Sequence, residues 1–131
     1  MRLKRGRAYV AATMVATVGV VVGLQGPASA AVGIVHVNGG FGRFLPDPVD
    51  TLPGDSIDAC DMASDGWGIE SRLDIGNNGS WDRVVDTRGH TAPYCTGFVG
   101  GNIREGTVVR LRVTPVKGTQ SGQWTEGLFI A

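Results

Sequence analysis

The sequence predicts a small all-β domain, an antiparallel β-sandwich of six or seven strands with one disulfide. Residues 67–75 and 107–116 alternate apolar and polar side chains with a period of two, which is typical of strands with one buried face. Seventeen of the 21 glycines lie in residues 31–131, and no window there repeats apolar residues at helical spacing. The chain's two cysteines, Cys60 and Cys95, also lie in this part.

The first thirty residues have the pattern of a secretory signal peptide. Four basic residues precede an almost entirely apolar run at residues 9–24, and residues 27–30 end in an Ala-x-Ala cleavage pattern. A transmembrane anchor needs about twenty apolar residues, more than this run provides. We therefore expect residues 1–30 to be removed, and residues 31–131 to form one secreted, extracellular domain without a stable membrane anchor.

The expected mature domain is acidic, although the whole chain is neutral. Four of the 12 Lys and Arg lie in residues 1–30, whereas all 12 Asp and Glu lie in residues 31–131, so that domain has a formal charge of −4. Its eight cations, seven arginines and Lys117, are scattered along the sequence. Because a basic stripe is missing, nucleic acid is not an expected partner.

Cys60 and Cys95 are expected to form a disulfide. An even number of cysteines in an exported protein is typical of a disulfide framework. A bridge that encloses a segment of this length would stabilise the fold by about 3 to 4 kcal/mol. The alternative, a catalytic thiol, is disfavoured because no Lys or His flanks either cysteine closely.

Shorter strands and turns complete the sandwich. Besides the two long strands, candidate strands lie at residues 32–37, 56–62, 81–86 and 123–130. Asp65-Gly66 and residues 77–79 favour tight turns, so residues 56–86 predict a three-strand meander.

Two long connections are expected between these strands. Residues 41–54 contain three prolines, and because proline cannot donate to a sheet ladder, we expect an irregular connection there. Residues 87–104 form the second connection, with a short strand around Phe98.

Strand parity predicts which side chains face the core. Trp67 and Trp124 lie on the inward faces of their strands and are expected to fill the core. If the two long strands are neighbours, Glu70 and Asp74 face arginines across the outer surface and form exposed ion pairs. Those arginines are Arg110 and Arg112.

Residues 103–113 resemble the corner and penultimate strand of fibronectin type III and immunoglobulin-like sandwiches, and residues 122–124 resemble the start of the closing strand. The resemblance implies the sandwich and not the antibody-type core, because the two cysteines are closer in sequence than in antibody domains. The mature chain is also similar to small secreted proteins of actinobacteria, in residues 59–66, 93–95 and 105–107. That similarity implies export and this fold, and it implies no particular chemistry.

No catalytic residue, metal site or cofactor is expected. A hydrolase aligns a nucleophile with a base, whereas His36 lies in an apolar strand, His90 lies in a Gly-rich loop, and the Gly-x-Ser-x-Gly motif is missing. The Asp- and Asn-rich turns near residues 58–65 and 74–82 are explained by turn formation. Calcium binding by these turns stays open, since calcium takes oxygen ligands. Zinc has no ligand set here.

Four residues are candidate binding residues: Trp81, Arg88, His90 and Tyr94. Trp81, at a predicted hairpin tip, either exposes a flat platform for a sugar ring or folds over one end of the sandwich. The other three lie in the second long connection, and loops at the ends of a rigid sandwich are where binding residues collect. Tyr94 either binds a ligand there or packs over the disulfide.

Together these features predict a non-enzymatic secreted binding module that contacts a cell-surface polysaccharide or another extracellular protein. The alternative is an inhibitor of an extracellular hydrolase such as a protease, in which residues 87–94, tethered near their end by Cys95, lie in the enzyme's cleft. A structural role in a cell coat is a third hypothesis.

Overall fold

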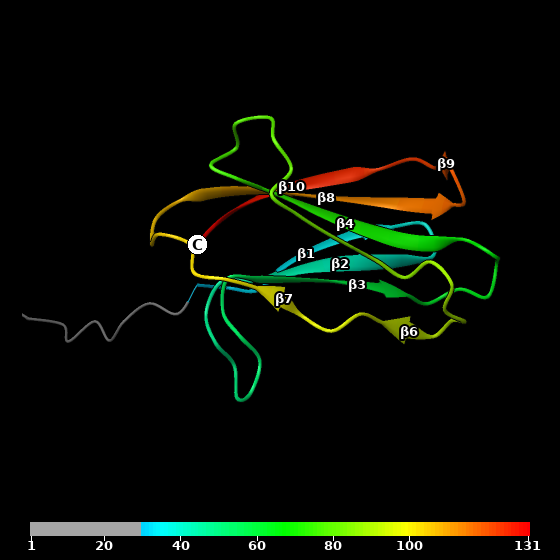
Figure 1. Ribbon diagram of the computed structural model, residues 1–131, viewed down its shortest axis with the longest axis horizontal. Coiled ribbons are helices and arrows are strands. Elements are labelled where there is room, and N and C mark those ends of the chain that lie inside the picture. The colour runs from blue at the N-terminus through cyan, green and yellow to red at the C-terminus, as the bar shows by residue number, and fades with distance from the viewer. Residues whose placement is uncertain (1–29) are drawn as a thin grey trace, which may run out of the picture.

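The computed structural model describes residues 30–131, so nearly all of the expected signal peptide lies outside the described residues. Within that range the fold is all-β, with ten strands in two antiparallel sheets that face each other (Figure 1). The predicted β-sandwich is therefore confirmed, with more strands than expected because three of them have only two residues. Among residues 30–131 the structure contains no helix long and apolar enough to cross a membrane.

The first sheet contains β1 (Gly33–Val37), β2 (Gly40–Leu45) and β3 (Ser56–Asp61) in that order, and both β6 (Tyr94–Cys95) and β7 (Val99–Gly100) pair with β3. The second sheet contains β10 (Thr125–Ile130), β8 (Val108–Lys117), β4 (Gly68–Ile75) and β5 (Arg83–Asp86) in that order, and β9 (Gln120–Ser121) pairs with β8.

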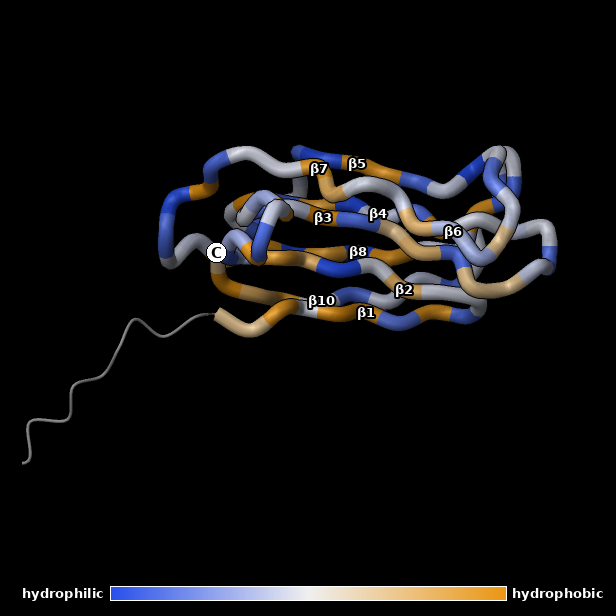
Figure 2. Tube along the Cα trace, turned by 90° about the horizontal axis from the view of Figure 1, so that it is seen from below, coloured by the Kyte–Doolittle hydropathy of each residue, from blue (hydrophilic) through white to orange (hydrophobic). Residues whose placement is uncertain are grey.

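The core lies between the two sheets and is built from alternate residues of their strands. Phe44 and Ile57 of the first sheet and Leu73, Leu111 and Val113 of the second are fully buried. Figure 2 shows the corresponding alternation, with short hydrophobic segments separated by paler or hydrophilic ones along the strands. Burial of each such side chain stabilises the fold by about 1.5 to 3 kcal/mol.

Of residues 41–54, only residues 46–54 form the irregular connection that their prolines predicted, and residues 41–45 belong to a strand. Residues 40–45 form β2, which pairs with β1 through the two-residue turn Asn38-Gly39, where Gly39 has a φ of 86°. The first proline is Pro46, so proline ends this strand instead of preventing it. The close approach of the two sheets explains why β2 has a glycine at position 42, because a Cβ there would lie only 2.6 Å from Val113 Cγ2.

The predicted meander over residues 56–86 is wrong. β4 pairs with β5, but β3 belongs to the other sheet, where it pairs with β2, β6 and β7. Residues 62–67 therefore cross from one sheet to the other instead of making a hairpin. A turn dipeptide such as Asp65-Gly66 reverses the chain equally well in both cases, so its sequence does not determine the sheet of the next strand.

β4 and β8 are neighbours, as predicted, and Asp74 lies opposite Arg110. The Arg110 Nη2 atom lies 2.8 Å from Asp74 Oδ2, but the expected exposure is wrong because Asp74 is fully buried. Glu70 is 5% exposed and contacts Arg72 and Arg88 instead of the expected cations of β8. The two carboxylates on the outer face of β4 are therefore paired with arginines from β4, from β8 and from the loop after β5.

Candidate binding site at one end of the sandwich

The loops that follow β3, β5 and β8 meet at one end of the sandwich. In Figure 1 the connections after β3 and β8 lie at the right end, and the C-terminus lies at the left end. The turn between β1 and β2 also reaches the loop-bearing end, where Met62 N donates to Gly39 O at 2.8 Å. Two open clefts lie among these loops.

Trp67 separates the two clefts and lines both of them. Its backbone is placed by the preceding turn, in which Asp65 Oδ1 accepts a hydrogen bond of 2.9 Å from Trp67 N and Gly66 has a φ of 79°. The side chain is half-buried, so the expectation that it fills the core is wrong. Strand parity failed here because Trp67 precedes the first residue of β4 and lies beyond the covering sheet.

The first cleft has a volume of about 560 Å³ and lies toward β5 and β6. Arg88 and His90 from the loop after β5, Lys117 from the end of β8, and Thr87 line it together with Trp67. Asp61 also lines this cleft, but it is only 3% exposed, and its Oδ1 accepts from Ala63 N at 3.1 Å. The exposed charges at this cleft are therefore cationic.

The second cleft has a volume of about 640 Å³ and lies toward β1 and β10. It is lined by polar side chains around Trp67 and Pro115, namely His36, Asn38, Asp65, Gln123 and Thr125. These side chains combine hydrogen-bond donors and acceptors, and none of them is a Lys or Arg. The second cleft therefore differs from the first in charge.

The loop over residues 87–93 is held firmly at its start. Thr87 is fully buried, its Oγ1 accepts from Ile69 N at 2.9 Å, and its own N donates to Ile69 O at 3.0 Å. Farther along, the His90 and Tyr94 rings stack, with centroids 3.8 Å apart and planes only 3° apart. The loop therefore presents an ordered aromatic pair.

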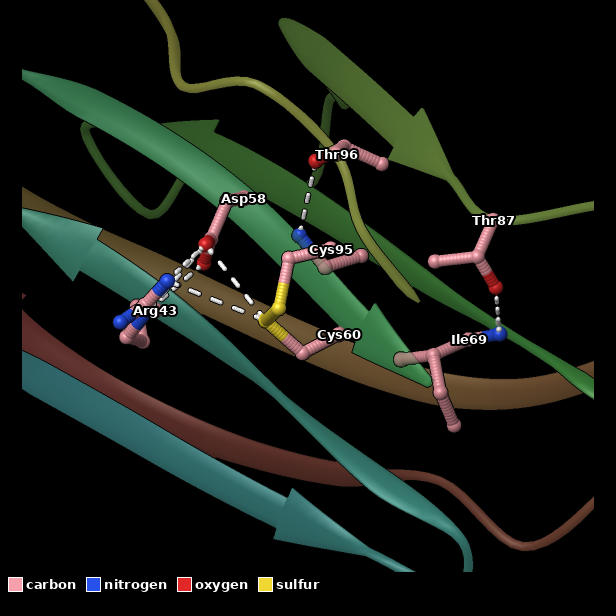
Figure 3. The surroundings of a disulfide bond; sticks show 8 residues. Arg43, Asp58, Cys60, Ile69, Thr87, Cys95 and Thr96 are labelled. Atoms are coloured by element: carbon pink, nitrogen blue, oxygen red, sulfur yellow. Dashed lines mark hydrogen bonds and ion pairs between the residues drawn. A yellow bond between two sulfur atoms is a disulfide. The ribbon is translucent and has the colours of Figure 1, made fainter. Parts of the chain in front are cut away.

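The disulfide holds the other end of this loop. Cys60 and Cys95 are bonded as predicted, and they are register partners of β3 and β6 within one sheet. Figure 3 shows the bridge beside β3, with Thr96 next to it and Thr87 hydrogen-bonded to Ile69. The Thr96 Oγ1 atom accepts from Ala59 N at 3.1 Å, which adds a hydrogen bond next to the bridge.

Arg43 and Asp58 form an ion pair beside the bridge. Arg43 Nε lies 3.1 Å from Asp58 Oδ1, and Arg43 Nη2 lies 3.8 Å from Cys60 Sγ (Figure 3). The hydrogen bond to Asp58 raises the pKa of the Arg43 guanidinium, although burial opposes this shift. Asp58 and the two bonded sulfurs lie close together, but disulfide sulfurs are not thiolates, so the group does not fit a metal.

Trp81 lies away from the clefts, on the outer face of the second sheet. The guanidinium carbons of Arg110 and Arg112 lie 4.8 and 4.9 Å from its ring centroid, so the indole is half-covered. Trp124 is on the same face, 44% exposed, with Arg112 4.1 Å from its ring. The expectation that Trp124 fills the core is therefore wrong.

The structure brings three of the four candidate binding residues to one place. Arg88 and His90 line the first cleft and Tyr94 stacks on His90, whereas Trp81 is distant in the fold. Sequence reasoning missed Trp67 and Lys117. The available signal was the Asp65-Gly66 turn next to a tryptophan, which places a large ring at the tip of the sandwich instead of inside it.

Comparison of the chain with protein-family models, with curated proteins and with solved structures finds no match.

Proposed function

We propose that this protein is a non-enzymatic, secreted binding module that holds a cell-surface polysaccharide across Trp67. One observation carries the proposal: a half-buried indole is the shared wall of two open clefts at the tip of a rigid sandwich. Each cleft falls within the usual range of ligand sites, about 300 to 1,000 Å³. A linear polymer fits this arrangement better than a compact ligand because the clefts continue on both sides of one ring.

The chemistry of the second cleft supports a sugar ligand. Asn38, Gln123 and Thr125 offer an amide, a second amide and a hydroxyl around the indole. Hydroxyl-rich rings need both donors and acceptors, and these groups supply both. The flat face of a pyranose ring is apolar and packs against an indole, which leaves its hydroxyls free for these side chains.

Secretion and the lack of catalysis are parts of the same proposal. A disulfide within the domain favours an oxidising compartment, in agreement with the predicted signal peptide. Both histidines pack against aromatic rings, His36 at 5.7 Å from Phe41 and His90 at 3.8 Å from Tyr94. A ligand-orienting role for His90 follows more directly from this packing than a general-base role.

The test is co-sedimentation of residues 31–131 with insoluble polysaccharides and with bacterial cell walls. We expect a bound fraction that Trp67→Ala abolishes and that Trp81→Ala leaves unchanged. Trp81→Ala is the matched control because it removes a half-buried tryptophan on another face of the molecule. Equal binding by both variants, or binding to none of the materials, would contradict the proposal.

A second candidate function is inhibition of an extracellular protease. It is favoured by the loop at residues 87–93, in which residues 88–91 are exposed and both ends are held, one by Thr87 and one by the disulfide. Such preorganisation lowers the ordering cost of binding in an enzyme cleft. Slowed proteolysis that disappears when residues 88–93 are replaced by Gly and Ser would favour inhibition over polysaccharide binding.

A further inference from the structure

We infer that the polysaccharide is anionic and that Lys117 binds its acid group in the first cleft. This inference rests on the proposed function and adds the chemical class of the ligand. The acid group is either a uronate carboxylate or a backbone phosphate, since both present oxygens that accept from an ammonium group. The sugar ring next to this group stacks on Trp67.

The ion pairs of the molecule leave few cations for a ligand. Arg43, Arg72, Arg88, Arg110 and Arg112 each contact a carboxylate, and Arg83 donates to the backbone oxygens of Asp55 and Gly101. Among residues 30–131, the remaining cations are Arg104 and Lys117, whose side chains make neither a hydrogen bond nor an ion pair.

The position of Lys117 distinguishes it from Arg104. Lys117 lines the first cleft together with Trp67, and its Nζ is 3.7 Å from the place where a Cβ on Gly66 would be. An ammonium group therefore stands next to the residue that precedes the indole. Arg104 is exposed near the C-terminal end of the molecule, where Thr107 N donates to its carbonyl oxygen, and it lines neither of the two clefts.

The two clefts give the ligand a direction. Arg88 in the first cleft is neutralised by Glu70 at 3.1 Å and by Asp86 at 3.2 Å, so Lys117 supplies the uncompensated charge there. The second cleft has Asp65 on its wall and no Lys or Arg. An acid group is therefore favoured in the first cleft and disfavoured in the second, where a neutral unit fits.

The overall charge of the domain indicates that the attraction between Lys117 and the acid group of the ligand is local. Residues 31–131 have a formal charge of −4, so the domain as a whole repels a polyanion. Affinity for an acidic polymer then depends on contacts within about one Debye length, which is about 8 Å at physiological ionic strength. A change at one residue, Lys117, is expected to affect binding measurably.

The experiment compares three soluble probes by affinity electrophoresis or calorimetry at low salt. Polygalacturonate supplies carboxylates, its fully methyl-esterified form supplies the same backbone without charge, and wall teichoic acid supplies phosphates. We expect wild-type protein to bind at least one of the two acidic probes more tightly than the ester. Preference for polygalacturonate identifies a carboxylate as the acid group, and preference for teichoic acid identifies a phosphate.

Lys117→Gln is expected to weaken binding of the preferred acidic probe about three- to ten-fold and to leave binding of the ester unchanged. Arg104→Gln is the matched control, since it removes the other unpaired cation, and it should bind as the wild type does. Both variants change exposed residues, so circular dichroism should show the same fold.

Two outcomes would overturn the inference, and they differ in what they mean for the proposed function. If the ester binds as well as the acidic probes and Lys117→Gln has no effect while Trp67→Ala abolishes binding, the polysaccharide site stands and its anionic character is wrong. If no probe binds and cell walls also fail to sediment the protein, the polysaccharide site itself is wrong.

Discussion

The two ends of the sandwich hold their loops in different ways. At the end near the C-terminus, a buried carboxylate closes the loop: Asp74 accepts from Asn78 N at 2.9 Å, from Gly79 N at 2.8 Å and from Arg110 at 2.8 Å. At the cleft end, Asp65 holds only the turn that precedes Trp67. The loop at residues 87–93 relies on Thr87 and on the disulfide.

The difference shows that an aspartate in a turn can have two roles: Asp74 closes a loop, whereas Asp65 positions the tryptophan that follows it. A carboxylate that accepts three hydrogen bonds is taken up by its own loop and by Arg110, and it is too buried to meet a ligand. A loop held at its two ends leaves open space between them, and the side chains there remain available. We therefore expect changes at the closed end to affect stability, and changes at the cleft end to affect binding more than stability, with the disulfide as the exception.

The largest expected effect is the loss of the disulfide. The double variant Cys60→Ala/Cys95→Ala frees a loop with a sequence separation of 35, so the free energy of unfolding should fall by about 3 to 4 kcal/mol. Urea unfolding followed by tryptophan fluorescence measures this change. A loss below about 1 kcal/mol would show that the pairing of β6 with β3 holds the loop without the bridge.

Asp74→Ala tests the closed end. It removes a buried carboxylate and leaves Arg110, whose side chain is 21% exposed, without this partner. We expect a loss of about 3 kcal/mol in the free energy of unfolding, at the low end for a broken buried pair because Arg110 is partly solvated and also contacts Glu126. Polysaccharide binding by the folded fraction should be unchanged, and a selective loss of binding would contradict the division between the two ends.

The stability contributed by Asp74 at the closed end is expected to depend on pH. Burial raises the pKa of Asp74, but hydrogen bonds from Asn78, Gly79 and Arg110 outweigh burial and hold the pKa below its ordinary value of 3.8. A depressed pKa in the folded state stabilises the fold above the unfolded pKa, and this contribution is lost as pH falls through the folded value. Unfolding midpoints measured between pH 5 and pH 2 should fall less steeply in Asp74→Asn than in the wild type.

The smallest expected effect concerns Trp124. Its indole is 44% exposed and stacks on Arg112 at 4.1 Å on the outer face of the second sheet, and it lines neither cleft. Trp124→Ala should reduce the free energy of unfolding by about 0.5 to 1 kcal/mol and leave sedimentation with polysaccharides unchanged. A loss above about 3 kcal/mol would restore the core position that strand parity predicted for this residue.

The sequence patterns predicted local features better than relations between distant segments. Periodicity located β4 and β8, and the paired cysteines were joined as expected. The sheet to which β3 belongs was missed because a turn dipeptide reverses a chain without fixing its new neighbour. β2 was missed because three prolines outweighed the Asn38-Gly39 hairpin turn, although all three follow the strand.

The candidate site was only partly predictable for a related reason. Arg88, His90 and Tyr94 were found because they share one long connection. Trp67 comes from the connection before β4 and Lys117 from the end of β8, and only the packing of the sheets brings them to the first cleft. Parity also misled at both tryptophans, since Trp67 and Trp124 each precede the first residue of a strand, where alternation no longer fixes the direction of a side chain.

The placement of the two ends of the described chain determines how the molecule can be attached to a support. β1 begins at Gly33, which lies opposite Phe44 near the end of β2, and Ala131 N donates to Thr107 O at 3.0 Å, so both ends of residues 31–131 lie at the closed end of the sandwich. A tag, a linker or a second domain joined at either position would extend from the end of the molecule opposite Trp67. If the domain were immobilised through either end, both clefts would face the solution and remain accessible to a polymer.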